Sequence, residues 1–147
     1  MKKILAVSSS GGHWTQLQRV SSAFSENEVV FVSTLKGYEK YVSEHKFYKV
    51  QDASSWSKIN LLVLFFEMVV IVFKEKPDVV FTTGAAPGLF GIILGRFFGS
   101  KTIWLDSIAN YEQLSLSGRL ASYFANLHLT QWSHLTNKKT KCLGKVI

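Results

Sequence analysis

The sequence has few cysteines, prolines and acidic residues, and each shortage excludes a class of protein. Cys142 is the single cysteine among 147 residues, so an internal disulfide framework and a multi-cysteine metal site are excluded, and a reducing compartment is expected. With two prolines and no low-complexity stretch, nothing divides the chain, and we expect one domain over residues 1–147. That length leaves no room for a dinucleotide-binding domain with a separate substrate domain.

Several motifs of well-known sites are also missing. No Ser-His-Asp order, paired-histidine spacing or H-E-x-x-H occurs, so nothing supports a hydrolase or a metalloenzyme, and we expect neither a metal nor a cofactor. The glycines match neither G-x-G-x-x-G nor the phosphate loop with its lysine, which argues against a dinucleotide site and an ATPase. The apolar run at residues 4–7 is too short for a signal peptide, so none is expected.

The charge balance points to an anionic partner. Lysine and arginine total 17 against 10 aspartates and glutamates, giving a net charge of +7. Nucleic-acid-binding proteins more often carry a dense basic run with interleaved aromatic residues, and this sequence has none. We therefore favour lipid headgroups or a diphosphate over nucleic acid, while a role in solubility alone stays open.

Apolar strand-like runs alternate with helix-like stretches along the whole chain. This alternation predicts an α/β fold, a Rossmann-like doubly wound parallel sheet with helices on both faces. The expected strands are residues 4–7, 28–33, 47–50, 79–82, 101–105 and 127–130, and residues 141–147 form either a last edge strand or an exit segment. The expected helices are residues 14–24, 37–45, 57–75 and 87–98, followed by one that begins near Ser117 as its N-cap.

One of these helices does not suit a soluble domain. Residues 59–73 contain only Asn60 and Glu67 as polar residues, and basic residues flank the segment. A small domain has too little core to bury such a helix on every side, and the segment is short for a membrane span. We expect an interfacial helix that packs on the sheet and contacts a membrane, with a partner protein or plain core as alternatives. The expected contact residues are Trp56, Leu62, Phe65, Phe66, Val69 and Phe73.

Two glycine-containing loops each lie between a strand and a helix. The first runs from Ser8 to His13 and includes Ser10, Gly11 and Gly12. The second holds Gly84, Ala85 and Gly88. Backbone amides at such turns and the start of the following helix attract phosphate groups, so the two loops predict an anion cradle at one edge of the sheet. His13 is a candidate base or hydrogen-bond donor, and ordinary turn and capping roles are the alternatives.

Polar residues also follow the fifth and sixth expected strands, at the edge where a doubly wound sheet binds its ligand. Asp106 directly ends an apolar strand and is a candidate base or sugar-hydroxyl acceptor, with loop capping as the alternative. Ser107 and Asn110 follow it, and Gln131 ends the sixth strand, so all are candidate binding residues.

Taken together, these segments resemble the acceptor-side, membrane-associated subunits of split GT-B glycosyltransferases. Relatives include PssD/EpsE/CpsF-type exopolysaccharide proteins, the anchor subunit of the dolichol-pathway UDP-N-acetylglucosamine transferase and the N-terminal half of MurG. The segments that carry the resemblance are S-S-G-G-H at 9–13, K-P-D-V-V at 76–80, T-G-A-A-P-G at 83–88, W-L-D-S at 104–107, L-S-L-S-G-R-L at 114–120 and Q-W at 131–132.

The resemblance implies a subunit that binds a polyprenyl-diphosphate-linked saccharide at the cytoplasmic face of the membrane. A separate small polypeptide, similar to a GT-B C-terminal half, would bind the UDP-sugar, and the pair would act in capsule or exopolysaccharide biosynthesis. The first loop, Gly11 to His13, would then meet the diphosphate, and Asp106, Ser107 and Asn110 would lie near the acceptor sugar. The eukaryotic subunits carry an N-terminal membrane span that is not expected here, so residues 59–73 would provide the anchor.

Two other functions remain open. A noncatalytic membrane scaffold would recruit a catalytic partner, and its glycine loops would be structural. A soluble flavodoxin-like nucleotide binder would also use the glycine loops, but the apolar helix argues against it.

Overall fold

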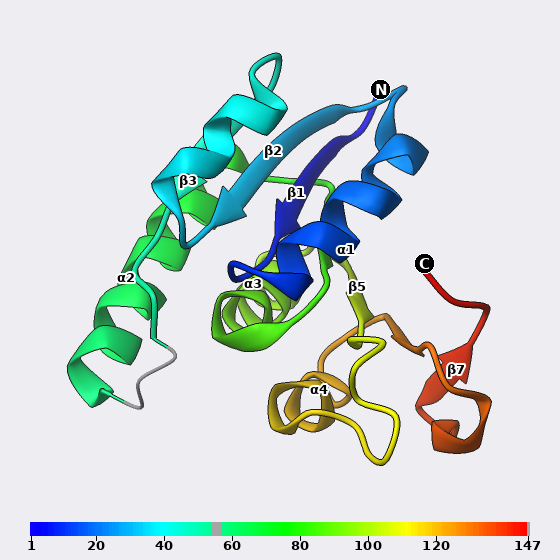
Figure 1. Ribbon diagram of the computed structural model, residues 1–147. Coiled ribbons are helices and arrows are strands. Elements are labelled where there is room, and N and C mark those ends of the chain that lie inside the picture. Colours follow the sequence, from blue (N-terminus) through cyan, green and yellow to red (C-terminus); the bar gives the residue numbers. More distant parts are fainter. Residues whose placement is uncertain (54–56, 147) are drawn as a thin grey trace.

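The strands form one seven-stranded, wholly parallel sheet in the order β3-β2-β1-β4-β5-β6-β7 (Figure 1). The structure is a computed structural model that describes residues 1–53 and 57–146. The strands are β1 (Lys3–Val7), β2 (Glu28–Ser33), β3 (Lys46–Lys49), β4 (Val79–Thr82), β5 (Lys101–Leu105), β6 (Leu127–Thr130) and β7 (Thr140–Cys142). The predicted doubly wound α/β fold is confirmed. Of the predicted segment 141–147, only the beginning belongs to the edge strand β7, and residues 143–146 follow it without regular structure.

The helices follow the predicted alternation with shifted ends. They are α1 (Gly12–Val20), α2 (Lys58–Glu75), α3 (Ala85–Phe97) and α4 (Leu116–Ala121), with 3₁₀ segments η1 (Ser21–Phe24), η2 (Lys36–Val42) and η3 (Ser133–Leu135). The N-cap prediction for the last α-helix was wrong: Ser115, not Ser117, caps α4, because its Oγ accepts the Gly118 N–H at 2.9 Å. The predicted helix at 37–45 is a 3₁₀ turn, and that at 14–24 divides into α1 and η1.

Two helical layers cover the sheet because successive side chains of a strand point to opposite faces. Leu5 and Val7 of β1 belong to the core beneath α2 and α3, whereas Ile4 and Ala6 belong to the core beneath α1. Figure 1 shows α1 and the cyan segment η2 on one side of the sheet, with α2 and α3 on the other.

Glycines on one side of α3 let this helix approach β4 closely. A Cβ on Gly95 would lie 2.6 Å from Val80 Cγ2, and one on Gly88 would overlap Thr82 Oγ1. A side chain at either position would push the helix off the sheet. These glycines therefore allow the close contact between α3 and β4.

The strand order reverses direction between β1 and β4, which are neighbours in the sheet. Val7 pairs with Thr82 at their carboxyl ends, and the loops after these strands lead to helices on opposite faces. In doubly wound sheets the ligand crevice lies at such a switch point, and we use the word crevice here for the edge between these two loops. Both predicted glycine loops lie there.

At the amino-terminal edge of the sheet, Glu75, the last residue of α2, forms ion pairs with Lys3 of β1 and Lys46 of β3. Its carboxylate accepts hydrogen bonds from Lys46 Nζ at 2.9 Å, from Lys3 Nζ at 3.3 Å and from the Tyr48 hydroxyl. Burial alone would raise the pKa of Glu75, but these bonds outweigh it and hold the pKa below its ordinary value. Burial, together with the Glu75 charge, raises the pKa of Tyr48 to about 12. We call these four residues the ionic cluster.

Candidate functional site

The two glycine loops are joined by hydrogen bonds between His13 and Thr83. The His13 ring lies against the Thr83 carbonyl, with Nδ1 2.8 Å from the oxygen, and the Thr83 hydroxyl donates to the His13 carbonyl at 2.6 Å. A Cβ on Gly84 would lie 2.9 Å from the His13 ring, and Gly84 has a φ of 129°. A glycine is therefore needed at this position to seat the imidazole.

These contacts fix the tautomer of His13. A carbonyl oxygen only accepts, so Nδ1 carries the proton and Nε2 has the free lone pair when the ring is neutral. The side chain is half-buried at the crevice. A ring held in this way is able to take a proton at Nε2 from a neighbouring hydroxyl.

The amides of the first loop are divided between internal contacts and the crevice. Ser10 N–H donates to Thr34 Oγ1 at 3.1 Å, and Gly11 N–H donates to the Tyr38 hydroxyl at 2.9 Å. The amides of Gly12 and His13 open α1 and have no hydrogen bond within the described chain. Among Ser10, Gly11, Gly12 and His13, the last two therefore have the amides available to an anion.

Packing between α3 and β4 determines the second loop more than it does the first. Its Gly84 N–H donates to Thr82 Oγ1 at 3.0 Å, and Ala85 opens α3 with a φ of 67°, a left-handed conformation that is uncommon for alanine. Gly88 faces Thr82 inside the helix–sheet contact. The loop therefore contributes its first residues to the crevice, while Gly88 holds α3 against β4.

Asp106 is buried, at 1% exposure, and both of its oxygens are in use. Oδ1 accepts from Trp104 Nε1 at 3.0 Å and from Ser115 Oγ at 2.7 Å. Oδ2 accepts from Ser115 N–H at 3.1 Å and from Asn110 Nδ2 at 3.2 Å. Four donors around one carboxylate favour a role in holding the 106–115 loop over a role as a mobile base.

A buried glutamine of α1 connects this loop to the first one. Gln16 Nε2 donates to Ser107 Oγ at 3.1 Å, and Gln16 Oε1 accepts from Gln131 Nε2 at 2.6 Å. Gln131 also donates to the Asp106 carbonyl at 3.0 Å. The sequence analysis did not single out Gln16. Its position three residues after His13 was the only available signal, because residues at that spacing share a helix face.

His128 supports the same loop from below and was also missed. Its ring stacks on Trp104 and donates from Nε2 to the Gly118 carbonyl at 2.7 Å, while Nδ1 accepts from Thr140 Oγ1 at 2.9 Å. Burial lowers the pKa of His128, although the Gly118 carbonyl and the Asp106 charge oppose this shift. The neutral ring ties α4 to β6 and β7.

The predicted site residues thus fall into two groups that share α1. His13 joins Ser10, Gly11 and Gly12 to Gly84 and Ala85. Gln16 joins Asp106, Ser107 and Asn110 to Gln131. In the described part of the chain, no cluster of His, Cys, Asp or Glu side chains is suited to hold a metal ion.

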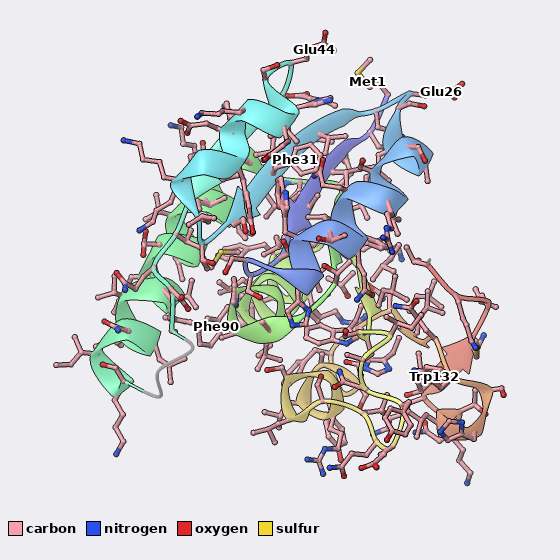
Figure 2. All side chains as sticks on the ribbon, in the orientation of Figure 1. Met1, Glu26, Phe31, Glu44, Phe90 and Trp132 are labelled. Atoms are coloured by element: carbon pink, nitrogen blue, oxygen red, sulfur yellow. The ribbon has the colours of Figure 1, made fainter. Side chains whose placement is uncertain are left out.

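Helix α2 exposes one apolar side, as predicted. Leu62, Phe66 and Phe73 are exposed, whereas Phe65 and Val69 are half-buried against the core. Phe90 of α3 turns toward α2 and meets Phe65 edge-on at 5.5 Å (Figure 2). Trp56 lies outside the described residues. We call the exposed set the apolar face: Ile59, Leu62, Val63, Phe66, Val70 and Phe73 of α2, with Phe97 and Phe98 at the end of α3.

The apolar face is not a membrane span. Within residues 1–53 and 57–146, no helix combines the length and the apolar character needed to cross a bilayer. The buried side of α2, with Leu64, Met68 and Val72, packs on the sheet.

The fold is shared with two solved structures, described as a MurG and as a UDP-N-acetylglucosamine 2-epimerase. The MurG structure from Acinetobacter baumannii superposes with a TM-score of 0.80 at 14% identity, over 100% of this chain and 46% of that one. A UDP-N-acetylglucosamine 2-epimerase from Rickettsia bellii superposes with a TM-score of 0.74 at 14% identity, over 99% of this chain and 45% of that one. The chain therefore spans about half the length of the solved structures it matches.

Sequence comparison gives the family. The chain is 26% identical over 183 aligned positions to the mouse (Mus musculus) protein named UDP-N-acetylglucosamine transferase subunit ALG14, with 99% of this chain and 83% of the mouse protein covered. Residues 25–146 match the family model described as oligosaccharide biosynthesis protein Alg14 like, a segment that includes the second glycine loop, Asp106 and Gln131. The chain belongs to the Alg14-like family of oligosaccharide biosynthesis proteins.

Proposed function

We propose that this chain is the acceptor-binding, membrane-facing subunit of a two-chain glycosyltransferase. The pair would transfer a sugar from a UDP-sugar to a saccharide on a polyprenyl diphosphate, in capsule or exopolysaccharide synthesis at the cytoplasmic face of the cell membrane. Two findings support this: the relative named as a transferase subunit, and the MurG structure of which this chain covers 46%. A small second polypeptide with the fold of the remaining half would bind the UDP-sugar.

The observation that carries the proposal is that hydrogen bonds between His13 and Thr83 join the two glycine loops. The free amides of Gly12 and His13 and the start of α1 favour an anion, and the crevice lies at the switch point of the sheet. A diphosphate fits this chemistry. Ala85 at the start of α3 is the matching element of the second loop.

In the proposed reaction His13 is the general base. The acceptor hydroxyl gives its proton to His13 Nε2, its oxygen forms the new bond to the anomeric carbon of the donor sugar, and the bond to UDP breaks. The Thr83 carbonyl keeps the ring in the required tautomer. Asp106 holds the 106–115 loop, so that Ser107 and Asn110 are placed to contact the acceptor sugar.

The apolar face would rest on the membrane. Its phenylalanines and aliphatic residues would enter the acyl boundary, while Lys58 and Lys74 at the two ends of α2 would meet anionic headgroups. This orientation would bring the lipid of the acceptor to the α2 side of the crevice.

The test is sugar transfer by the complex co-expressed with its small partner, assayed on a polyprenyl-diphosphate saccharide. We expect His13→Ala to lower kcat by about 10²–10⁴-fold, as loss of a general base does. Lys40→Ala, an exposed change on η2, serves as the control and should leave the rate unchanged. Full activity of folded His13→Ala would exclude the base role. Full activity of the partner alone in detergent would favour the noncatalytic scaffold.

A further inference from the structure

A groove opens on the side of the sheet away from the apolar face, between α1 and η2. Its volume is about 610 Å³, and it is lined by Gly11, Trp14, Thr15, Gln18, Arg19, Tyr38 and Tyr41. Gly11 belongs to both this groove and the first glycine loop, and its N–H donates to the Tyr38 hydroxyl at 2.9 Å. The groove therefore borders the first glycine loop. We call it the aromatic groove.

The aromatic wall of the groove is rigid. Tyr38 stacks on Trp14 with 4.4 Å between ring centroids and 9° between planes, and Tyr41 meets Tyr38 edge-on at 6.3 Å. Trp14 is itself fixed from below by the rings of Phe31 and Phe47. Tyr41 remains 72% exposed. Such preformed ring surfaces suit a flat ligand face of C–H bonds, as a pyranose presents.

Polar groups beside the rings lack partners. Among the described residues, Gln18 Nε2 is buried and has no hydrogen-bond partner, which is costly unless the amide turns to an acceptor in the groove that Gln18 lines. Arg19, the next residue of α1, is exposed and forms no ion pair within the described chain. The lining includes no aspartate or glutamate. Aromatic rings with neighbouring amide and guanidinium donors match the hydroxyls and ring face of a sugar better than a purely apolar ligand.

The position of the groove relative to the first glycine loop indicates where the saccharide of a lipid-linked ligand would lie. The first glycine loop lies at the carboxyl edge of the sheet, with the apolar face on one side and the aromatic groove on the other. A lipid-linked diphosphate at Gly12 and His13, with its lipid on the α2 side, would extend its saccharide toward α1 and η2. We propose that the aromatic groove is a subsite for a pyranose ring of the acceptor saccharide, stacked on Tyr38 and Tyr41 and hydrogen-bonded by Gln18 and Arg19. This rests on the proposed function.

The experiment separates the sugar from the diphosphate. Calorimetric titration of the full-length chain in detergent would use two soluble probes, phytanyl diphosphate and phytanyl diphosphoglucose. The glucose should tighten binding about tenfold, a modest gain for one stacked and hydrogen-bonded ring. Tyr41→Ala and Gln18→Ala should remove most of that gain and leave the Kd for phytanyl diphosphate unchanged. The matched control is Tyr123→Ala in the turn that follows α4, since Tyr123 is 70% exposed and does not line the groove.

Each outcome decides something. No gain from glucose, or a gain that Tyr41→Ala and Gln18→Ala leave intact, overturns the subsite. If these variants keep the glucose gain but lose the co-expressed partner in pull-down, the groove is instead a protein interface. If neither probe binds to the folded chain, the proposed acceptor-binding function itself is wrong. Repeating the titration with a glucuronate-bearing probe tests Arg19, because a carboxylate should then add affinity that Arg19→Ala removes.

Discussion

At the scale of single residues, the most informative feature is the difference between two candidate catalytic groups. Among the described residues, His13 Nε2 has no hydrogen-bond partner, whereas both oxygens of Asp106 accept hydrogen bonds. The sequence placed His13 at the start of a helix and Asp106 at the end of a strand, both at the same edge of the sheet, and did not separate their roles. Hydrogen-bond partners distinguish them, because a base needs a free lone pair at the reacting hydroxyl.

Asp106→Asn tests the positioning role. The amide nitrogen of asparagine would face a donor, Ser115 or Trp104, so we expect a loss of about 1–3 kcal/mol in the free energy of unfolding. Transfer activity should fall while the shape of its pH–rate profile is kept. Loss of the acidic limb of that profile would instead identify Asp106 as the base.

Glu75→Gln tests the ionic cluster through pH. The pKa of Glu75 is lowered in the fold from 4.5, so its stabilisation is complete above that pH and is lost as pH falls through the folded pKa. At pH 7 the substitution should cost on the order of 2 kcal/mol, because its lysine partners are partly exposed and screened. Urea denaturation at a series of pH values should show this cost shrinking as the solution is acidified below pH 4. A cost independent of pH would contradict the ionic explanation.

At the scale of elements, the short helix α4 depends on one glycine. A Cβ on Gly118 would overlap Asp106 Oδ1 and lie 2.7 Å from Ser115 Oγ. This explains the L-S-L-S-G segment physically: Ser115 caps the helix and binds Asp106, and Gly118 lets the two approach. The sequence showed the segment as a family resemblance without this reason.

Gly118→Ala should therefore destabilise the fold by about 1–3 kcal/mol, the usual cost of forcing an extra methyl group into a packed site. The control is Gly37→Ala in η2, where a Cβ meets nothing within 4 Å and φ is not positive. That change should be neutral or slightly stabilising. Chemical denaturation of both variants measures the difference, and equal stabilities would refute the packing argument.

The sequence predicted most elements because the apolar runs are short and sharply bounded. The bounds of β2, β4, β5 and β6 match the predicted ranges, since each strand is a short, mainly apolar segment rich in β-branched or aromatic residues or leucine and bounded by turn residues. The polar network was not predictable. Gln16 and Gln131 are 115 positions apart along the chain, and only the sheet order brings their side chains to 2.6 Å. Likewise, the sequence did not indicate that Tyr38 occupies the Gly11 amide.

At the scale of the whole molecule, the two faces of the sheet differ in chemistry. One carries the apolar face, with Phe97 81% exposed, and the other carries the aromatic groove with Arg19. The carboxyl edge with the glycine loops lies between them. This asymmetry is what a protein at a bilayer surface needs when its ligand is apolar at one end and polar at the other.

Binding to vesicles checks this orientation. The double variant Phe66→Ser, Phe73→Ser should bind vesicles containing phosphatidylglycerol about tenfold or more weakly, because each ring loses part of its apolar transfer energy. Tyr41→Ser removes an equally exposed ring from the opposite side of the sheet and should leave vesicle binding unchanged. Flotation assays at two salt concentrations measure both. Equal losses for the two variants would contradict the assigned face.

The ionic cluster and the glycine loops occupy opposite ends of β1, which begins at Lys3 and leads into the first loop at Ser8. Stability and ligand chemistry can therefore be varied independently within one sheet. Glu75→Gln supplies an internal calibration: it should unfold the protein more readily without touching the crevice. The activity lost by that variant measures the effect of lower stability alone. Any larger loss in a site variant of similar stability then reflects a change in the crevice.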